Sequence, residues 1–217
     1  MNIITKKVRL VPAPFVGTRI RIKVPSSSDA SLEYRIWVVR RADGCDSFTI
    51  DWGDGVQEKK TSHLNQGHVY DAPGEYEIRI SDEINYLVIC TPNGGTGLYP
   101  TQYTPSVLSL VTNATKLLEL GSFNGCRNMS TFDIHDSSVS TLSENSFINC
   151  TSLSGDIFLP RISDLPCTDH QPFDGCTGGI THIHFSAEHE EAIRNSAAFL
   201  ADPTLGTGIE NVCLFDL

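Results

Sequence analysis

The chain has 217 residues and a net charge of −10, and this length is sufficient to bury one large core or two small ones. The charge is uneven, because residues 1–90 carry 12 Lys/Arg and 12 Asp/Glu whereas residues 91–217 carry 4 and 14. The acidic second half argues against nucleic acid and anionic membranes as partners, since both bind Lys/Arg-rich surfaces.

The N-terminal residues and the apolar runs bear on localisation. No apolar run approaches the roughly 20 residues that a membrane-spanning helix needs, so we expect no membrane insertion. Lys6, Lys7 and Arg9 stand where a secretory signal would need its apolar stretch. The sequence as given therefore predicts synthesis in the cytoplasm without an ordinary secretory signal.

The first part of the chain is rich in predicted strands. Residues 18–24, 33–39, 47–52 and 75–81 alternate β-branched or aromatic residues with polar ones, and turn-forming clusters separate them. No convincing helix is present. Several short antiparallel strands in about 85 residues indicate a β-sandwich, which we assign to residues 1–90.

A glycine-rich turn and the strands after it carry a family resemblance. The segment FTIDWGDGVQ…GHVYDAPGEYEIRI resembles the polycystic-kidney-disease (PKD) domain, an immunoglobulin-like spacer and binding module. The matching residues are Trp52, Gly53, Asp54, Gly55, His68, Tyr70, Pro73, Gly74, Tyr76 and Ile78. We expect Asp54 and Gly55 to form a hairpin-type turn, with His68 and Tyr70 packed and hydrogen-bonded beneath it.

Residues 91–104 are predicted to form a linker, because the segment TPNGGTGLYPTQYTP supplies turn formers and few core residues.

A motif Phe-x-x-Cys then occurs three times, at Phe123/Cys126, Phe147/Cys150 and Phe173/Cys176. An apolar residue follows each motif, and then an alternating pair such as Ile157 and Leu159. The spacing of three suits a helical or 3₁₀ turn and the alternation suits a short strand. A degenerate earlier copy places Ala114 in the Cys position.

Such units cannot bury their own apolar face alone, so we predict that they stack into a solenoid. The pattern resembles the BspA-like (Treponema-type) leucine-rich repeat over about residues 105–185. The unit SFINCTSLSGDIFLP is a close match, whereas the unit from Phe173 departs from the pattern. The resemblance implies adhesin-like or surface-binding roles, and the repeat itself carries no catalytic residues.

Seven cysteines are present, an odd number, with no C-x-x-C or Cys/His finger spacing. A chain of this length does not depend on disulfides for stability. We therefore interpret Cys126, Cys150 and Cys176 as small hydrophobic residues in a buried ladder.

The C-terminal part is predicted to close the solenoid. Ser186 suits an N-cap, acidic residues follow it, and Asp202-Pro203 ends the helical pattern. Ala192, Ile193, Ala197 and Leu200 form an apolar stripe at helical spacing, and a strand is expected within residues 209–217. The predicted fold is thus mainly β: a PKD-like β-sandwich (1–90), a linker (91–104), and a leucine-rich-repeat solenoid with a helix and strand cap (105–217).

No enzyme signature was found. The chain lacks a G-x-S-x-G elbow and a G-x-x-x-x-G-K phosphate loop, so we predict no catalytic residues and no cofactor. His182 and His184 are expected to point outward from one strand, where they could hold a metal with Glu188 or His189 nearby; exposed side chains without a metal are the interpretation we adopt. Asp164, Asp169 and His170 in the irregular segment 161–171 complete the candidate ligand-binding residues, although that segment could simply bridge two coils.

Two functions remain open. The first is a non-catalytic recognition or adhesion module that binds a protein or glycan at a surface. The alternative is a structural or host-contact component of a phage or prophage particle, with self-assembly as a further property. The absence of a secretory signal in the given chain favours the alternative, whereas the usual role of the repeat family favours the first.

Overall fold

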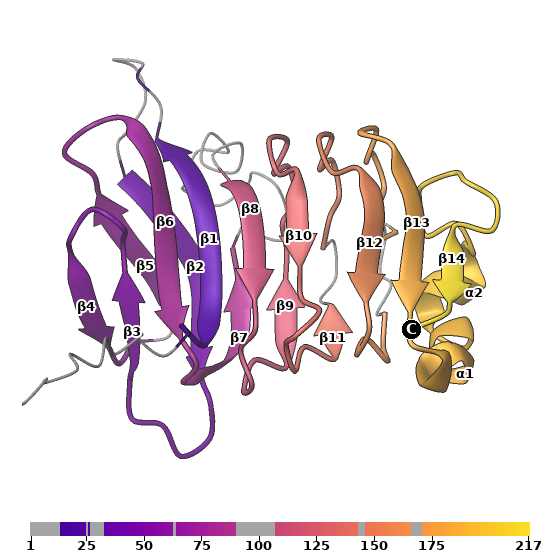
Figure 1. Cartoon of the computed structure of the whole chain (residues 1–217), viewed down its shortest axis with the longest axis horizontal. Helices are drawn as coiled ribbons and strands as arrows, with labels where there is room; N and C mark the ends of the chain where they lie inside the picture. The colour runs from indigo at the N-terminus through magenta and orange to yellow at the C-terminus, as the bar shows by residue number, and fades with distance from the viewer. Residues whose placement is uncertain are drawn as a thin grey trace, which may run out of the picture.

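The computed structural model describes residues 14–24, 26, 33–62, 64–89, 107–142, 146–165 and 171–217, and these residues are mainly β, as predicted. Strands follow one another along the longest axis of the molecule, and the helical segments lie at its C-terminal end (Figure 1). The predicted linker 91–104 lies outside the described residues, as do the candidate residues Asp169 and His170.

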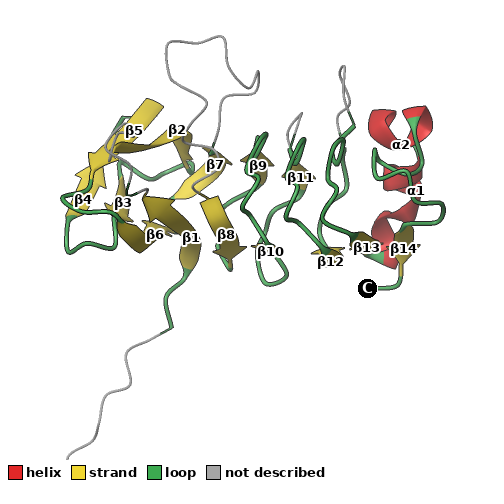
Figure 2. Cartoon of the chain, turned by 90° about the horizontal axis from the view of Figure 1, so that it is seen from above, coloured by secondary structure: helices red, strands yellow, loops and turns green. Residues whose placement is uncertain are grey.

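The strands of the described residues form three hydrogen-bonded sheets. The six-stranded sheet has the order β10-β8-β1-β6-β3-β4, the five-stranded sheet β11-β9-β7-β2-β5, and the three-stranded sheet β12-β13-β14. Viewed from above, they form two rows, in which β12, β13 and β14 continue the row of the six-stranded sheet (Figure 2). The bounds are β1 Gly17–Val24, β2 Glu33–Arg41, β3 Phe48–Asp51, β4 Gln57–Lys60, β5 Leu64–Val69, β6 Gly74–Ser81, β7 Ile84–Val88, β8 Val107–Thr112, β9 Glu119–Gly121, β10 Thr131–Asp133, β11 Thr141–Leu142, β12 Gly155–Leu159, β13 Ile180–Phe185 and β14 Cys213–Phe215.

The N-terminal strands form because their side chains alternate between the core and solvent. In β1, Ile20 and Ile22 are fully buried while Arg21 and Lys23 are exposed. The four strands expected from the sequence coincide with β1, β2, β3 and β6. The sequence did not predict β4, β5 or β7. The β4 sequence QEKK has no apolar residue, and this strand lies at the edge of its sheet, where a polar strand is tolerated.

Strands from beyond the predicted linker extend both N-terminal sheets. β8 pairs antiparallel with β1, and the hydroxyls of Thr18 and Thr112 are hydrogen-bonded at 2.9 Å across this pairing. β9 pairs parallel with β7. Buried side chains from Ile20 to Val212 belong to one continuous core cluster. The boundary at residues 90–105 stays a prediction, but the described sheets and core continue across it.

Parallel pairing begins where the repeats begin. The described pairs within residues 14–89 are antiparallel, whereas β10–β8, β11–β9, β12–β13 and β13–β14 are parallel. A repeated turn-plus-strand unit places each strand beside the equivalent strand of the preceding unit in the same direction, and this relationship produces parallel ladders.

The three repeat phenylalanines stack on one another in the core. The rings of Phe123 and Phe147 lie 5.3 Å apart, and those of Phe147 and Phe173 lie 5.1 Å apart, with interplanar angles of 9° and 3°. All three are fully buried. The backbone follows the same register, since the Phe147 amide donates to the Pro172 carbonyl and the Phe173 amide to the Leu205 carbonyl. Each repeat therefore packs against the equivalent residues of the next.

The residue before each repeat cysteine has a left-handed backbone. The φ angles are 77° at Gly125, 59° at Asn149 and 72° at Gly175. Glycine and asparagine tolerate this region better than other residues, which explains the sequences NGC, INC and DGC. In each turn the Cys amide also donates to the carbonyl of the Phe three residues earlier, which is the tight turn expected from the spacing.

The C-terminal helical segment differs from the single helix expected from the sequence. It consists of η2 (Ala187–His189), α1 (Glu190–Arg194) and α2 (Ala197–Ala201). Ser196 interrupts the helix, because its hydroxyl accepts a hydrogen bond from the Phe199 amide and caps α2. The break changes the helical phase, so the predicted apolar stripe is wrong: Leu200 is 69% exposed. Among the described residues, no helix has the length and apolar character needed to cross a membrane.

Candidate functional site

The glycine-rich turn at residues 52–55 is held together by its own side chains. Asp54 Oδ2 lies 2.6 Å from His68 Nε2, and the His68 ring stacks on Trp52 with centroids 5.0 Å apart. The Tyr70 hydroxyl donates to the Trp52 carbonyl at 3.0 Å. Trp52 and Tyr70 are fully buried. These contacts agree with the packing and hydrogen bonding expected beneath the turn.

The two glycines of this turn have different surroundings. Gly53 has a φ of 83°, and a Cβ there would lie 2.6 Å from the Glu77 carbonyl oxygen. Gly55 has a φ of 98°, but a Cβ there would meet no atom within 4 Å. Burial alone would raise the pKa of the Asp54 carboxyl, but hydrogen bonds from His68 and the Val56 amide lower it below the usual value. The turn thus uses its polar groups for internal contacts.

A second group of polar side chains lies on the outer face of the three-stranded sheet. Because side chains alternate along a strand, Ile183 and Phe185 of β13 enter the core while His182 and His184 lie on the opposite face. In the register of this sheet, His184 lies opposite Phe158 of β12 and Leu214 of β14. The outer face therefore brings together residues that are far apart in the sequence.

Asp156 reaches both histidines from β12. The β12–β13 register shifts between Gly155 and Ile157, so Asp156 sits at the irregularity. Its Oδ1 lies 3.4 Å from His182 Nδ1 and its Oδ2 lies 3.5 Å from His184 Nε2. One ligand atom from each of these three residues lies within 4.8 Å of the other two.

Asp216 and Phe158 hold the His184 ring in place. The Asp216 carboxylate lies 2.8 and 3.1 Å from His184 Nδ1. The Phe158 ring stacks on the imidazole with centroids 4.6 Å apart and planes 14° apart. His184 is only 9% exposed, although it lies on the outer face, because these neighbours cover it. We call Asp156, His182, His184 and Asp216 the outer-face cluster.

The candidate residues expected from the sequence do not form one site. His182 and His184 come together, as their spacing on a strand predicts. Asp164 forms an isolated parallel bridge with Thr141 of β11, in the other row of strands. His189 and Glu188, considered as metal ligands, contact each other with atoms 3.5 Å apart and are not part of the cluster.

Asp156, Asp216 and Phe158 were not among the candidate residues predicted from the sequence. Each lies one residue from a core-facing position, so the alternation places them on the outer face. What the sequence does not give is the register that aligns β12 and β14 with β13. Aligning the repeats on Phe-x-x-Cys predicts part of this register. Ile157 and Ile183 occupy equivalent positions in two repeats, and they are partners in the β12–β13 pairing.

Comparison with known protein families, with curated proteins and with solved structures gives no match to this chain.

Proposed function

We propose that the protein is a non-catalytic recognition module that binds a protein or glycan ligand at the surface of a cell or virion. In this proposal the N-terminal strands form a PKD-like, immunoglobulin-like β-sandwich and the repeats form a short BspA-like leucine-rich-repeat solenoid closed by the C-terminal helices and β14. The sequence resemblances support this assignment, and so do the stacked repeat phenylalanines and the parallel strands.

The observation that carries the proposal is the composition of the outer face of β12 and β13. Phe158 is 40% exposed, and it lies beside Asp156 and the two β13 histidines. An exposed aromatic ring among hydrogen-bonding groups can stack on a sugar ring or pack on a ligand side chain, while its polar neighbours fix the ligand orientation. Strands hold these groups more rigidly than a loop would.

The charge of the second half adds to this surface. Residues 91–217 carry 14 acidic and 4 basic residues, so the field around the repeats is negative and draws partners with basic groups. A neutral glycan relies instead on the aromatic ring and the hydrogen-bonding groups. A polyanionic ligand is repelled by the same field.

Binding can be tested with the full chain on a glycan array and in pull-downs from extracellular protein fractions. The matched variants are Phe158→Ala on the proposed surface and Leu118→Ala, which alters a residue that is 50% exposed between β8 and β9. The proposal predicts that Phe158→Ala reduces binding while Leu118→Ala preserves it. Equal binding by both variants, with folding intact, would show that the β12–β13 face does not bind the ligand.

A structural role in a phage or prophage particle remains the second candidate function. The thiols of Cys150 and Cys176 donate to the carbonyls of Phe123 and Phe147, at 3.2 and 2.9 Å. These bonds require reduced cysteines, which fits a protein that folds in the cytoplasm before particle assembly. Purified protein that assembles into regular particles or tubes under electron microscopy would favour this function over the first.

A further inference from the structure

The outer-face cluster has the features of a transition-metal site. We propose that Asp156, His182 and His184 bind one Zn²⁺ ion, with Asp216 orienting His184. The sequence alone led us to expect no metal, so this inference rests on the geometry of β12, β13 and the residue that follows β14. It does not depend on the proposed recognition function, because metal binding is measured on the protein alone.

The distances fit a tetrahedral ion. Zinc lies about 2.0–2.1 Å from nitrogen and oxygen ligands, so two ligands of a tetrahedral ion are about 3.3–3.4 Å apart. The Asp156 carboxylate oxygens lie 3.4 Å from His182 Nδ1 and 3.5 Å from His184 Nε2. The two distances involve different oxygens of Asp156, and one ligand atom from each residue lies within 4.8 Å of the other two, so side-chain rotations would bring the three ligands around one ion.

The hydrogen bonding of His184 leaves one nitrogen available for a metal. A carboxylate only accepts hydrogen bonds, so His184 Nδ1 carries the proton in its contact with Asp216. In the neutral ring, Nε2 then has a free lone pair. Among the described atoms Nε2 is buried and has no hydrogen-bond partner, although it faces Asp156.

A buried nitrogen without a partner is costly, and a metal ion would satisfy it. Metal-binding histidines usually donate their other ring nitrogen to a carboxylate, which fixes the tautomer and the ring orientation. Asp216 has this position relative to His184, and the stacked Phe158 ring restricts the imidazole further. His184 is therefore already oriented for binding.

The ligand set also selects the class of metal. Two imidazoles and one carboxylate suit Zn²⁺ and similar transition metals, whereas Ca²⁺ and Mg²⁺ prefer sites made of oxygen ligands. Three protein ligands leave a fourth position for water or an external group. Since Asp156 is exposed, this position opens toward solvent.

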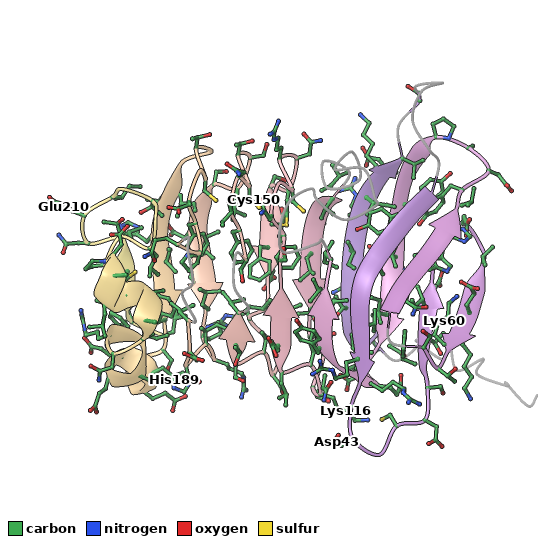
Figure 3. All side chains as sticks on the ribbon, turned by 180° about the vertical axis from the view of Figure 1, so that it is seen from behind. Asp43, Lys60, Lys116, Cys150, His189 and Glu210 are labelled. Carbon is green, nitrogen blue, oxygen red and sulfur yellow. The ribbon has the colours of Figure 1, made fainter. Side chains whose placement is uncertain are left out.

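Zinc binding can be measured by isothermal titration calorimetry on the untagged, reduced full chain. We expect one Zn²⁺ per chain for the wild type and no such binding for His184→Ala or Asp156→Asn. His189→Ala is the matched control, since His189 lies on the helical segment outside the cluster (Figure 3) and should leave binding unchanged. Ca²⁺ and Mg²⁺ titrations should show no binding at this site.

Asp216→Asn tests the positioning role. It should weaken zinc affinity by about 10–100-fold while keeping one ion per chain, and Asp216→Glu should restore part of the affinity. Thermal melts without metal show whether each variant is folded. Asp156→Asn keeps the size of the side chain on an exposed position, so it tests the site even if His184→Ala fails to fold.

Cobalt distinguishes this site from binding to the thiols. Co²⁺ bound by nitrogen and oxygen ligands in a tetrahedral site gives visible d–d bands without the intense near-ultraviolet band of a thiolate ligand. Three results would overturn the proposal: no zinc binding by the wild type, unchanged binding by both His184→Ala and Asp156→Asn, or a thiolate band in the cobalt spectrum.

Discussion

The Sγ atom of Cys176 donates a hydrogen bond to the carbonyl oxygen of Phe147 at 2.9 Å. Cys150 makes the same contact with Phe123, one repeat earlier. Cys126 and Cys150 are buried as predicted, whereas Cys176 is only partly buried. The repeat cysteine therefore has two roles: it is small enough to pack in the stack, and its thiol gives a second hydrogen bond to a phenylalanine carbonyl that already accepts the cysteine amide of the preceding repeat. Alanine would fill the first role but not the second.

Cys150→Ala is expected to reduce the free energy of unfolding by about 1–2 kcal/mol, because it removes packing atoms and leaves the Phe123 carbonyl without its thiol donor. Urea denaturation measures the change. Cys45→Ala is the control, since Cys45 is partly exposed and outside the stack. Equal stability of the two variants would show that the thiol ladder contributes little.

Gly53→Ala should destabilise the protein more than Gly55→Ala. Both positions have positive φ, so each substitution lowers the free energy of unfolding by about 1–2 kcal/mol, because alanine disfavours the left-handed backbone. Only the Gly53 methyl would approach the Glu77 carbonyl at 2.6 Å, which adds roughly 1–3 kcal/mol of steric strain. Thermal melts of the two variants provide the comparison, and similar losses would argue against the close approach at Gly53.

Asp54 should contribute to the acid sensitivity of the fold. Its pKa is lowered in the folded protein, so its contribution to stability is present above its ordinary pKa of 3.8 and disappears as the pH falls through the lowered value. The stability difference between the wild type and Asp54→Asn should therefore become smaller as the pH is lowered from about 6 to about 2. Unfolding measured at both pH values gives the result, and a difference independent of pH would contradict it.

The continuous sheets predict that both halves unfold together. Both tryptophans lie in the first 90 residues, and Cys150 lies in the repeats, where its side chain is fully buried. Tryptophan fluorescence and the reactivity of the buried thiols therefore report on different parts of the chain. Their unfolding midpoints in urea should coincide. Two separate transitions would instead support independent modules joined by the 91–104 linker.

Much of this fold can be predicted from the sequence, because its local patterns are strong. Alternation in residues 18–24 and 75–81 predicts β1 and β6, and the Phe-x-x-Cys spacing predicts a turn followed by a short strand. The glycine or asparagine before each cysteine was a further signal of a left-handed turn residue. The interruption at Ser196 was missed, because the helical periodicity of residues 187–201 looks continuous until the capping hydroxyl is considered.

The candidate site was less predictable than the fold. The spacing of His182 and His184 places both on the outer face of one strand, and the sequence is sufficient for that inference. Asp156 and Asp216 reach the histidines only through the register of β12 and β14 with β13, which depends on long-range pairing. Opposite Asp156, β13 has one residue more than β12 between the flanking partner pairs, and no local pattern predicts this irregularity.

Anomalous X-ray diffraction at the zinc edge, from crystals of the zinc-loaded full chain, shows whether the outer-face cluster binds the metal. We expect an anomalous peak coordinated by Asp156, His182 and His184 Nε2, with the Asp216 carboxylate still hydrogen-bonded to His184 Nδ1. A zinc-loaded crystal without a peak at this cluster, or with a peak only at cysteine thiols, would contradict it.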